Sequence, residues 1–308
     1  MSAPAKLVAF AAALAVLLGG GALAGGSIHP SPSGPRAQHS DAAGTTTGAH
    51  DVGHRENRTM PSTPHDESAV HGAEQPAADP VRGLAVAENH LRVVVENAEL
   101  RRGHTEQVRF RIVDDAGNTV RDFDVEHDKR MHFIVARHDL TGFQHLHPEQ
   151  AADGSWTVDV KLDQAGSYRL FADFAVADKS YTLASDLRVD GRADLKPLPA
   201  PSPTAVSDGG YDVRLDAGNV HPGQEADLRF TITKDGHAVH VEPYLGADGH
   251  LVALREGDMA FLHVHPTGGQ SDAVGFMATF PTEGRYRLFL QFKYEGRVHT
   301  AAFTQEVS

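Results

Sequence analysis

Polar and apolar residues alternate over residues 107–112, which run Gln-Val-Arg-Phe-Arg-Ile, and over residues 227–232, which run Asp-Leu-Arg-Phe-Thr-Ile. A period of two predicts β-strands with one buried face. Apolar and β-branched segments predict further short strands at Leu91–Val95, Trp156–Leu162, Tyr168–Phe174, Tyr181–Val189, Tyr211–Leu215, Phe276–Phe280, Tyr286–Phe292 and Val298–Val307. No long helical period follows residue 24. About seven short strands per hundred residues, with frequent turns between them, predict an antiparallel β-sandwich.

The strands belong to two copies of one unit. A pattern of three histidines and a proline, H-x12-H-x-H-P, begins at His132 and again at His250, and its four positions lie 118 residues apart. The motifs around Tyr168 and Tyr286 keep this offset. Each resembles the tyrosine corner of immunoglobulin-like domains, in which a Tyr entering a late strand hydrogen-bonds back. The predicted fold class is therefore all-β, with two tandem immunoglobulin-like antiparallel β-sandwiches.

Each histidine segment predicts a β-hairpin. In the second copy, Gly257 and Asp258 are the two loop residues that a primed turn favours. The resulting register places His250 opposite His265, with His263 on the same face of the hairpin. Three imidazoles are therefore expected to cluster in the second repeat.

The same register, moved by the offset, places His132 opposite His147, with His145 on the same face. Three neutral imidazoles form a ligand set that suits copper or zinc. One tri-histidine metal site is thus expected in each repeat. Asp124 and Glu242, which also lie 118 residues apart, are candidates for a fourth ligand or for an acceptor that orients an imidazole. The alternative for these two acids is a solvent-facing place at a strand end.

Five other histidines have no histidine at the matching position of the other repeat, and they are expected to lie at the surface without a role. They are His127, His138, His237, His240 and His299.

Composition narrows the function further. The 308 residues, 40% of them hydrophobic, suffice for about two domains. A net charge of −13 argues against a nucleic-acid partner. The absence of cysteine excludes disulfides, thiolate zinc sites, a cysteine nucleophile and a cysteine-ligated blue-copper centre. The 20 histidines are a high count that points to metal chemistry.

The chain begins with a segment typical of an export signal. Lys6 precedes an uncharged run over residues 7–24 that ends in the small-residue site Ala-Leu-Ala. Residues 1–24 are therefore expected to be a signal peptide, and the alternative is an N-terminal membrane anchor through residues 7–24. Either segment predicts that the remainder is exported.

The composition changes again after the signal. Residues 25–82 are rich in Gly, Ser, Thr, Pro and Ala and are expected to form a disordered, histidine-containing linker. The first sandwich is expected over residues 83–191 and the second over 207–308. A Pro-rich linker at residues 192–206 is expected to join them.

The two-repeat exported organisation, with the segments His221–Phe230 and Gly249–Pro266, resembles bacterial secreted or periplasmic heavy-metal-binding proteins. Their domains are similar to YtkA-like and CopC-like immunoglobulin-type folds. The resemblance covers roughly residues 84–308, and its specific part is the two histidine hairpins. It implies metal binding outside the cytoplasm. The chain has only five methionines and no Met-rich tract, which weakens the case for Cu(I).

The expected function is that of an exported, non-enzymatic protein that binds or buffers copper or zinc. The alternative is a metal-free cell-envelope immunoglobulin-like module whose histidines pack or line an interface. Catalysis by a metal-bound water is disfavoured because the sequence identifies no general base and no substrate pocket. The expected partners are a metal ion and an envelope protein, and the expected location is secreted or extracytoplasmic, with membrane anchoring through residues 7–24 as the variant.

Overall fold

The computed structural model describes residues 81–262, 264–268 and 273–308. The signal or anchor expected at residues 1–24, all but the last two residues of the expected linker, and His263 lie outside the described residues. Within the described part of the chain, no helix is long and apolar enough to cross a membrane.

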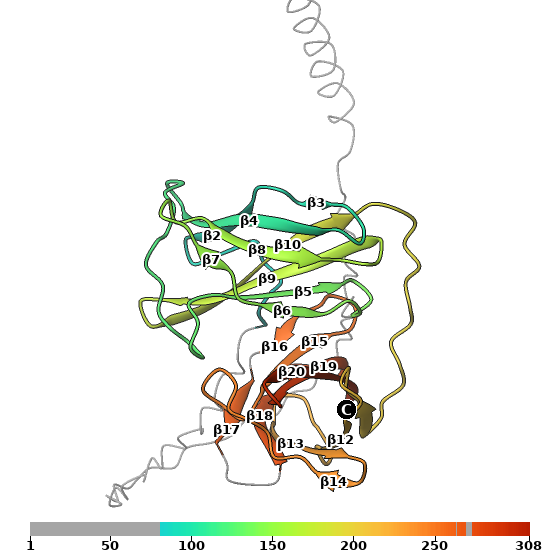
Figure 1. The fold of residues 1–308 in the computed structure, drawn as a ribbon. Coiled ribbons are helices and arrows are strands. Elements are labelled where there is room, and N and C mark those ends of the chain that lie inside the picture. Colours follow the sequence, from blue (N-terminus) through green and yellow to red (C-terminus); the bar gives the residue numbers. More distant parts are fainter. Residues whose placement is uncertain (1–80, 263, 269–272) are drawn as a thin grey trace, which may run out of the picture. The chain divides into compact units, whose positions relative to one another are not determined.

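The first repeat has two sheets (Figure 1). One has the order β1–β2–β4–β8–β7, made of β1 (Ala87–Glu88), β2 (Leu91–Val95), β4 (Thr105–Asp114), β8 (Trp156–Lys161) and β7 (Glu149–Gln150). The other has the order β3–β10–β9–β5–β6, made of β3 (Glu99–Leu100), β10 (Lys179–Val189), β9 (Gly166–Val176), β5 (His132–Arg137) and β6 (Gln144–Leu146). All strand pairs are antiparallel except β3 with β10. Apolar side chains fill the space between the sheets, as in the contact of Phe110 with Phe133.

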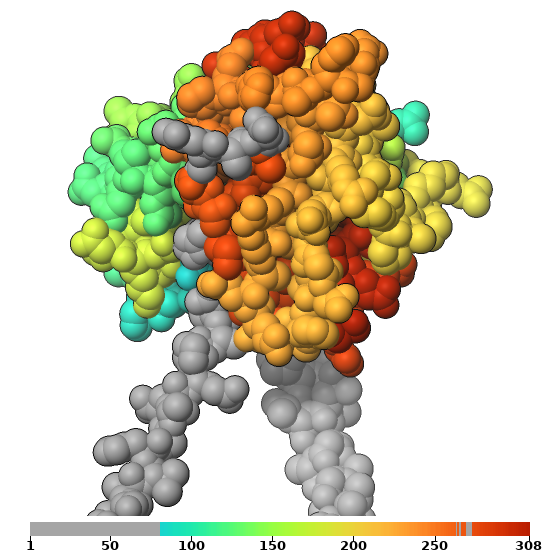
Figure 2. Space-filling model, turned by 90° about the horizontal axis from the view of Figure 1, so that it is seen from below, coloured from blue at the N-terminus to red at the C-terminus, as the bar shows by residue number. Residues whose placement is uncertain are grey.

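The second repeat is built in the same way. One sheet contains β11 (Thr204–Val206), β12 (Asp212–Asp216), β13 (Glu225–Lys234), β18 (Ala273–Thr279) and β17 (His265–Thr267), with β14 (His237–Ala238) paired to β13. The other contains β16 (Phe261–Leu262), β15 (His250–Arg255), β19 (Gly284–Tyr294) and β20 (Arg297–Val307). Figure 2 shows the space-filling surface of this repeat in yellow to red.

The predicted fold class is confirmed, because the described residues form two all-β repeats with mainly antiparallel sheets. Each predicted strand has a counterpart, and β2 has the predicted bounds. The Pro-rich linker differs from the prediction at its end. Thr204–Val206 forms β11 and pairs with β12, so these three residues belong to the second sandwich.

The two tyrosine corners form local hydrogen bonds. The Tyr168 hydroxyl donates to the carbonyl of Gln164 at 2.8 Å, and the Tyr286 hydroxyl donates to the carbonyl of Thr282 at 3.0 Å. Both tyrosines are buried. Each acceptor lies four residues upstream, so the bond fixes the entry of β9 or β19 and does not cross the sandwich.

The second histidine hairpin has the predicted register with a different loop. Leu254 lies opposite Phe261, as predicted. The loop is longer than two residues, because the amide of Arg255 donates to the carbonyl of Ala260 and the amide of Met259 donates to the carbonyl of Arg255. Positive φ occurs at Gly257 (97°) and Met259 (60°). The prediction of a primed two-residue turn at Gly257 and Asp258 is therefore wrong, but a four-residue loop preserves the same pairing.

A third apolar cluster contains residues from both repeats. Phe143 stacks on Phe289 with ring centroids 4.0 Å apart, and Phe171 packs against Phe261 at 5.4 Å. Phe261 and Phe289 occupy the positions 118 residues after Phe143 and Phe171. The two contacts therefore exchange when the repeats are exchanged, which is the property of a two-fold interface.

Candidate metal centre

The first histidine hairpin brings its three imidazoles together. His132 begins β5, His145 lies in β6, and His147 follows β6 directly. The pairs Phe133 with Leu146 and Ile134 with His145 have the predicted register, and β6 ends at Leu146, one residue before His147. One ring nitrogen from each of the three histidines lies within 4.8 Å of the others. The register derived from the sequence therefore produces a set of converging ligands in the first repeat.

Hydrogen bonds fix which nitrogens face the centre of this set. Nε2 of His132 donates to the carbonyl of Glu126 at 3.1 Å, and Nδ1 of His145 donates to Oε1 of Gln291 at 2.7 Å. These acceptors assign the tautomers, because a neutral imidazole carries one N–H. The two remaining nitrogens, Nδ1 of His132 and Nε2 of His145, lie 3.0 Å apart. Each presents a lone pair, so the pair is repulsive unless a cation lies between them.

The third histidine adds an unpartnered nitrogen. Nε2 of His147 is buried and has no hydrogen-bond partner. Such an atom costs free energy unless something else satisfies it. The ring centroids of the three histidines are 5.2 Å apart for His132 and His145, 5.1 Å for His132 and His147, and 5.0 Å for His145 and His147. Imidazoles bound at about 2.0–2.1 Å to one tetrahedral ion have centroids about 5 Å apart, since each centroid lies about 1 Å behind its nitrogen. The triad therefore has the spacing of three ligands on one ion.

Burial keeps these imidazoles neutral. It lowers the pKa of His132, and burial together with repulsion from His132 lowers the pKa of His145 well below 6.5. Burial, followed by repulsion from His132, lowers the pKa of His147 to about 4. Burial, followed by repulsion from His127, lowers the pKa of His250 to about 4. Neutral rings retain the lone pairs that a metal ion needs.

His250 of the second repeat lies beside the first triad. Its ring centroid is 6.1 Å from that of His132 and 5.9 Å from that of His145. The expected pairing of His250 with His265 is wrong, because β17 leaves the hairpin and pairs in the other sheet, where His265 lies opposite Met277. The other neighbour of His250 in its sheet is Gln291 of β19. His263 lies outside the described residues, so the second predicted triad is not described as a whole.

Three further residues adjoin the cluster. His127, expected at the surface, packs its ring 5.1 Å from that of His250. Asp173 lies opposite His132 in the pairing of β5 with β9, and Gln291 occupies the matching position of the second repeat. No sequence signal beyond the 118-residue offset marks Asp173 and Gln291, because their place depends on which strands become neighbours.

His299 was also expected at the surface, and it is buried against Tyr211.

Asp124 and Glu242 do something other than orient an imidazole. The Asp124 carboxylate accepts a hydrogen bond from the amide of Asp178 at 2.9 Å, and the Glu242 carboxylate accepts one from the amide of Gly296 at 3.0 Å. The two amides also lie 118 residues apart, in the β9–β10 and β19–β20 turns. The expectation that these acids serve the metal site is therefore replaced by a structural role. Each carboxylate caps the turn of a long hairpin.

The cluster lines a small cavity that is partly open to solvent. The cavity has a volume of about 40 Å³ and is lined by His127, His132, His145 and His250, by Asp173, and by apolar side chains of both repeats. A water molecule needs about 10–15 Å³ by this measure. The space thus admits an ion or a few waters, and it is too small for an organic substrate.

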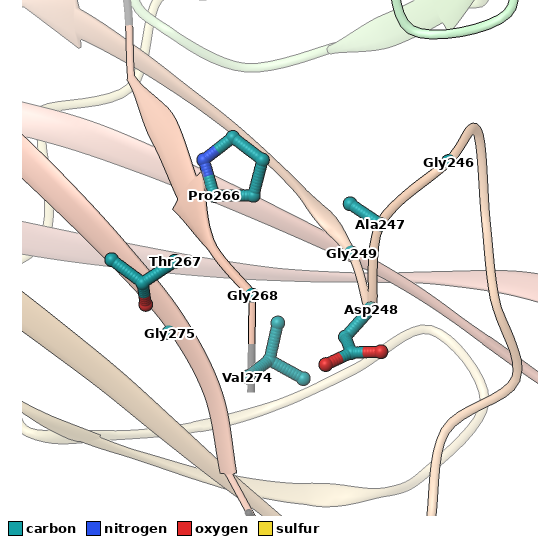
Figure 3. Close-up of a pocket in the computed structure, with 9 residues that line it drawn as sticks. All are labelled: Gly246, Ala247, Asp248, Gly249, Pro266, Thr267, Gly268, Val274 and Gly275. Atoms are coloured by element: carbon teal, nitrogen blue, oxygen red, sulfur yellow. The ribbon is translucent and has the colours of Figure 1, made fainter. Parts of the chain in front are cut away.

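A larger pocket of about 460 Å³ lies in the second repeat (Figure 3). The described residues around it come from residues 246–249, 266–268 and 274–275. Asp248 is the one charged side chain among them. Within this described part of the wall, a single carboxylate offers too few ligands for a metal and no acid–base pair.

A comparison with protein families supports the repeat. A family model described as a domain of unknown function (DUF8832) matches residues 85–191 and 204–308. No curated protein matches the chain. Among solved structures, the chain is similar to the Escherichia coli adhesin FdeC (14% identity, 73% of this chain and 66% of that chain, TM-score 0.24). It is also similar to the Yersinia pseudotuberculosis adhesin InvE (12%, 71% and 59%, TM-score 0.24) and to Salmonella alpha-2-macroglobulin (13%, 75% and 15%, TM-score 0.27). This chain therefore spans less than two thirds of each of those chains, and similarity at this level assigns no function.

Proposed function

We propose that this chain, which belongs to the DUF8832 family, binds a copper or zinc ion through His132, His145 and His147 and does so without enzymatic activity. The observation that carries the proposal is the pair of lone pairs that face each other 3.0 Å apart, on Nδ1 of His132 and Nε2 of His145. A proton between them would create a buried imidazolium, which burial disfavours. A metal ion satisfies both nitrogens, and the buried Nε2 of His147, which has no hydrogen-bond partner, is a candidate for the third ligand atom.

The donor set selects the class of metal. Three imidazole nitrogens suit zinc and copper, whereas magnesium and calcium prefer oxygen ligands. The acceptors behind two of the rings, the Glu126 carbonyl and Oε1 of Gln291, support the same assignment, because metal-bound histidines donate their other N–H to such groups. The 40 Å³ cavity beside the cluster has room for an ion, which supports metal binding. The export signal expected at residues 1–24 supports a role in holding metal outside the cytoplasm.

The alternative function is a metal-free cell-envelope module in which the histidines line an interface. It is favoured by one observation, the hydrogen bond from His145 of the first repeat to Gln291 of the second. Under this hypothesis the cluster holds the two repeats together, and an envelope protein is the partner. Metal binding separates the two functions directly.

Equilibrium dialysis of the untagged chain against zinc and, separately, Cu(II) tests the proposal. We expect one tight equivalent that is lost in His145→Ala and in His147→Ala. The matched control is His237→Ala, which changes an exposed histidine in β14 and should leave this equivalent in place. If the parent and the two cluster variants bind the same amount of metal, the cluster is an interface and the alternative holds.

A further inference from the structure

His250 of the second repeat lies beside two rings of the first triad, those of His132 and His145. A tetrahedral ion with three imidazoles has a fourth position. The His250 ring is 6.1 Å from the His132 ring, inclined by 29°, and 5.9 Å from the His145 ring. Its Nε2 lies 3.4 Å from the carbonyl of Leu245, to which it donates, so that Nδ1 keeps its lone pair.

The position of His250 follows from the two-fold relation between the repeats. His132 and His250 occupy matching positions of the two repeats, and residues at matching positions meet near the axis of a two-fold interface. The Phe143–Phe289 and Phe171–Phe261 contacts define the same relation on the apolar part of the interface. The cluster is thus one centre shared by both repeats, in contrast to the two separate centres that the sequence predicts.

We propose that a single ion takes His132, His145 and His147 from the first repeat and His250 from the second, and that it thereby cross-links the two repeats. This inference rests on the proposed metal binding. It adds that the ligand set is closed, with four imidazoles and no position for a reacting water. Such closed sites are structural, in contrast to catalytic ones that keep a position open.

Metal binding should also tighten the contact between the repeats. The rings of the triad are already 5.0–5.2 Å apart, whereas His250 is about 1 Å farther from two of them than a shared tetrahedral ion requires. Closing that gap moves β15 toward β5. Metal binding should therefore reduce the motion of one repeat relative to the other.

The chain contains no cysteine, so the proposed cross-link between the repeats can be tested by site-directed spin labelling. Arg102→Cys in the first repeat and Glu283→Cys in the second place one label on each repeat at exposed positions. Pulsed dipolar spectroscopy then measures the label separation in the full chain with zinc or with a chelator. We expect zinc to narrow the distance distribution of the labelled parent. His250→Ala should abolish the narrowing and weaken zinc binding by at least about tenfold, since losing a ligand costs no less than losing its outer hydrogen bond.

Two further variants keep the outcomes distinct. His250→Gln preserves polarity and volume at the site, and it should behave like His250→Ala if ligation is what matters. His237→Ala should retain both the narrowing and the affinity. If zinc binds the parent and His250→Gln equally and the distributions stay broad, the cross-link is refuted while the triad site stands. If the parent binds no zinc, the proposed function itself fails.

Discussion

Lowering the pH from 7.5 to 5 should destabilise the metal-free protein through its buried histidines. His147 and His250 have pKa values lowered to about 4 in the folded state, against 6.5 for an ordinary histidine. Below pH 6.5 the unfolded chain therefore binds protons at these histidines that the folded chain does not bind. Their contribution to stability is full above pH 6.5 and is lost as the pH falls from 6.5 toward 4.

The magnitude follows from the two pKa values. At pH 5 an ideal site of this kind loses about 2 kcal/mol relative to pH 7.5. Two such sites would lose about 4 kcal/mol, and partial solvent exposure with mutual coupling reduces this to roughly 2 kcal/mol. Asp139 and Asp153, whose pKa values are lowered to about 2, contribute little in this window, because they stay ionised in the folded chain and, with an ordinary pKa of 3.8, are largely ionised at pH 5 in the unfolded chain.

Urea unfolding in the presence of a chelator, at pH 7.5 and pH 5, measures the difference. The double variant His147→Gln with His250→Gln removes two of the four buried imidazoles and should reduce the pH dependence, to which His132 and His145 also contribute. The exposed control His237→Gln should retain the full pH dependence. An equal pH dependence in the parent and the double variant would refute the argument, because the loss would then not come from His147 and His250.

Other variants probe the interface, the hairpin caps and the ligand support. Phe289→Ala removes the ring stacked on Phe143 and should cost about 3 kcal/mol in urea unfolding; a cost below about 1 kcal/mol would mean that the repeats do not depend on this contact. Asp124→Ala should cost about 1 kcal/mol and leave zinc affinity unchanged, because its carboxylate caps a turn; a fall in affinity would restore it to the site. Gln291→Leu should weaken zinc binding about tenfold in a competition titration by releasing the His145 ring, and unchanged affinity would show that the ring needs no such support.

The sequence predicts the fold well because each strand can be recognised from the pattern of its own residues. The alternation at residues 107–112 and 227–232 requires only a period of two, and both segments lie in long strands, β4 and β13. The register of both histidine hairpins follows from one pairing rule and one offset. The loop at Gly257 differs from the predicted two-residue turn, but the register is the predicted one, because a four-residue loop closes the same pairs.

The candidate site is only half predicted, because the sequence argument places the ligands of each repeat within one hairpin. The approach of His250 to the rings of His132 and His145 depends on how the two repeats pack, which a hairpin register does not specify. His127 was expected to have no role because the matching residue of the second repeat, residue 245, is leucine. Comparing the two repeats cannot identify a residue that only one repeat contributes to a shared centre.

Zinc X-ray absorption shows whether one ion is bound by imidazoles of both repeats. The chain loaded with one equivalent of zinc should show four nitrogen neighbours at about 2.0 Å with the outer scattering of imidazole rings. His250→Ala should show three such rings with a new light-atom neighbour. A parent spectrum with oxygen neighbours and fewer than three imidazoles, or one that His250→Ala leaves unchanged, would contradict the account.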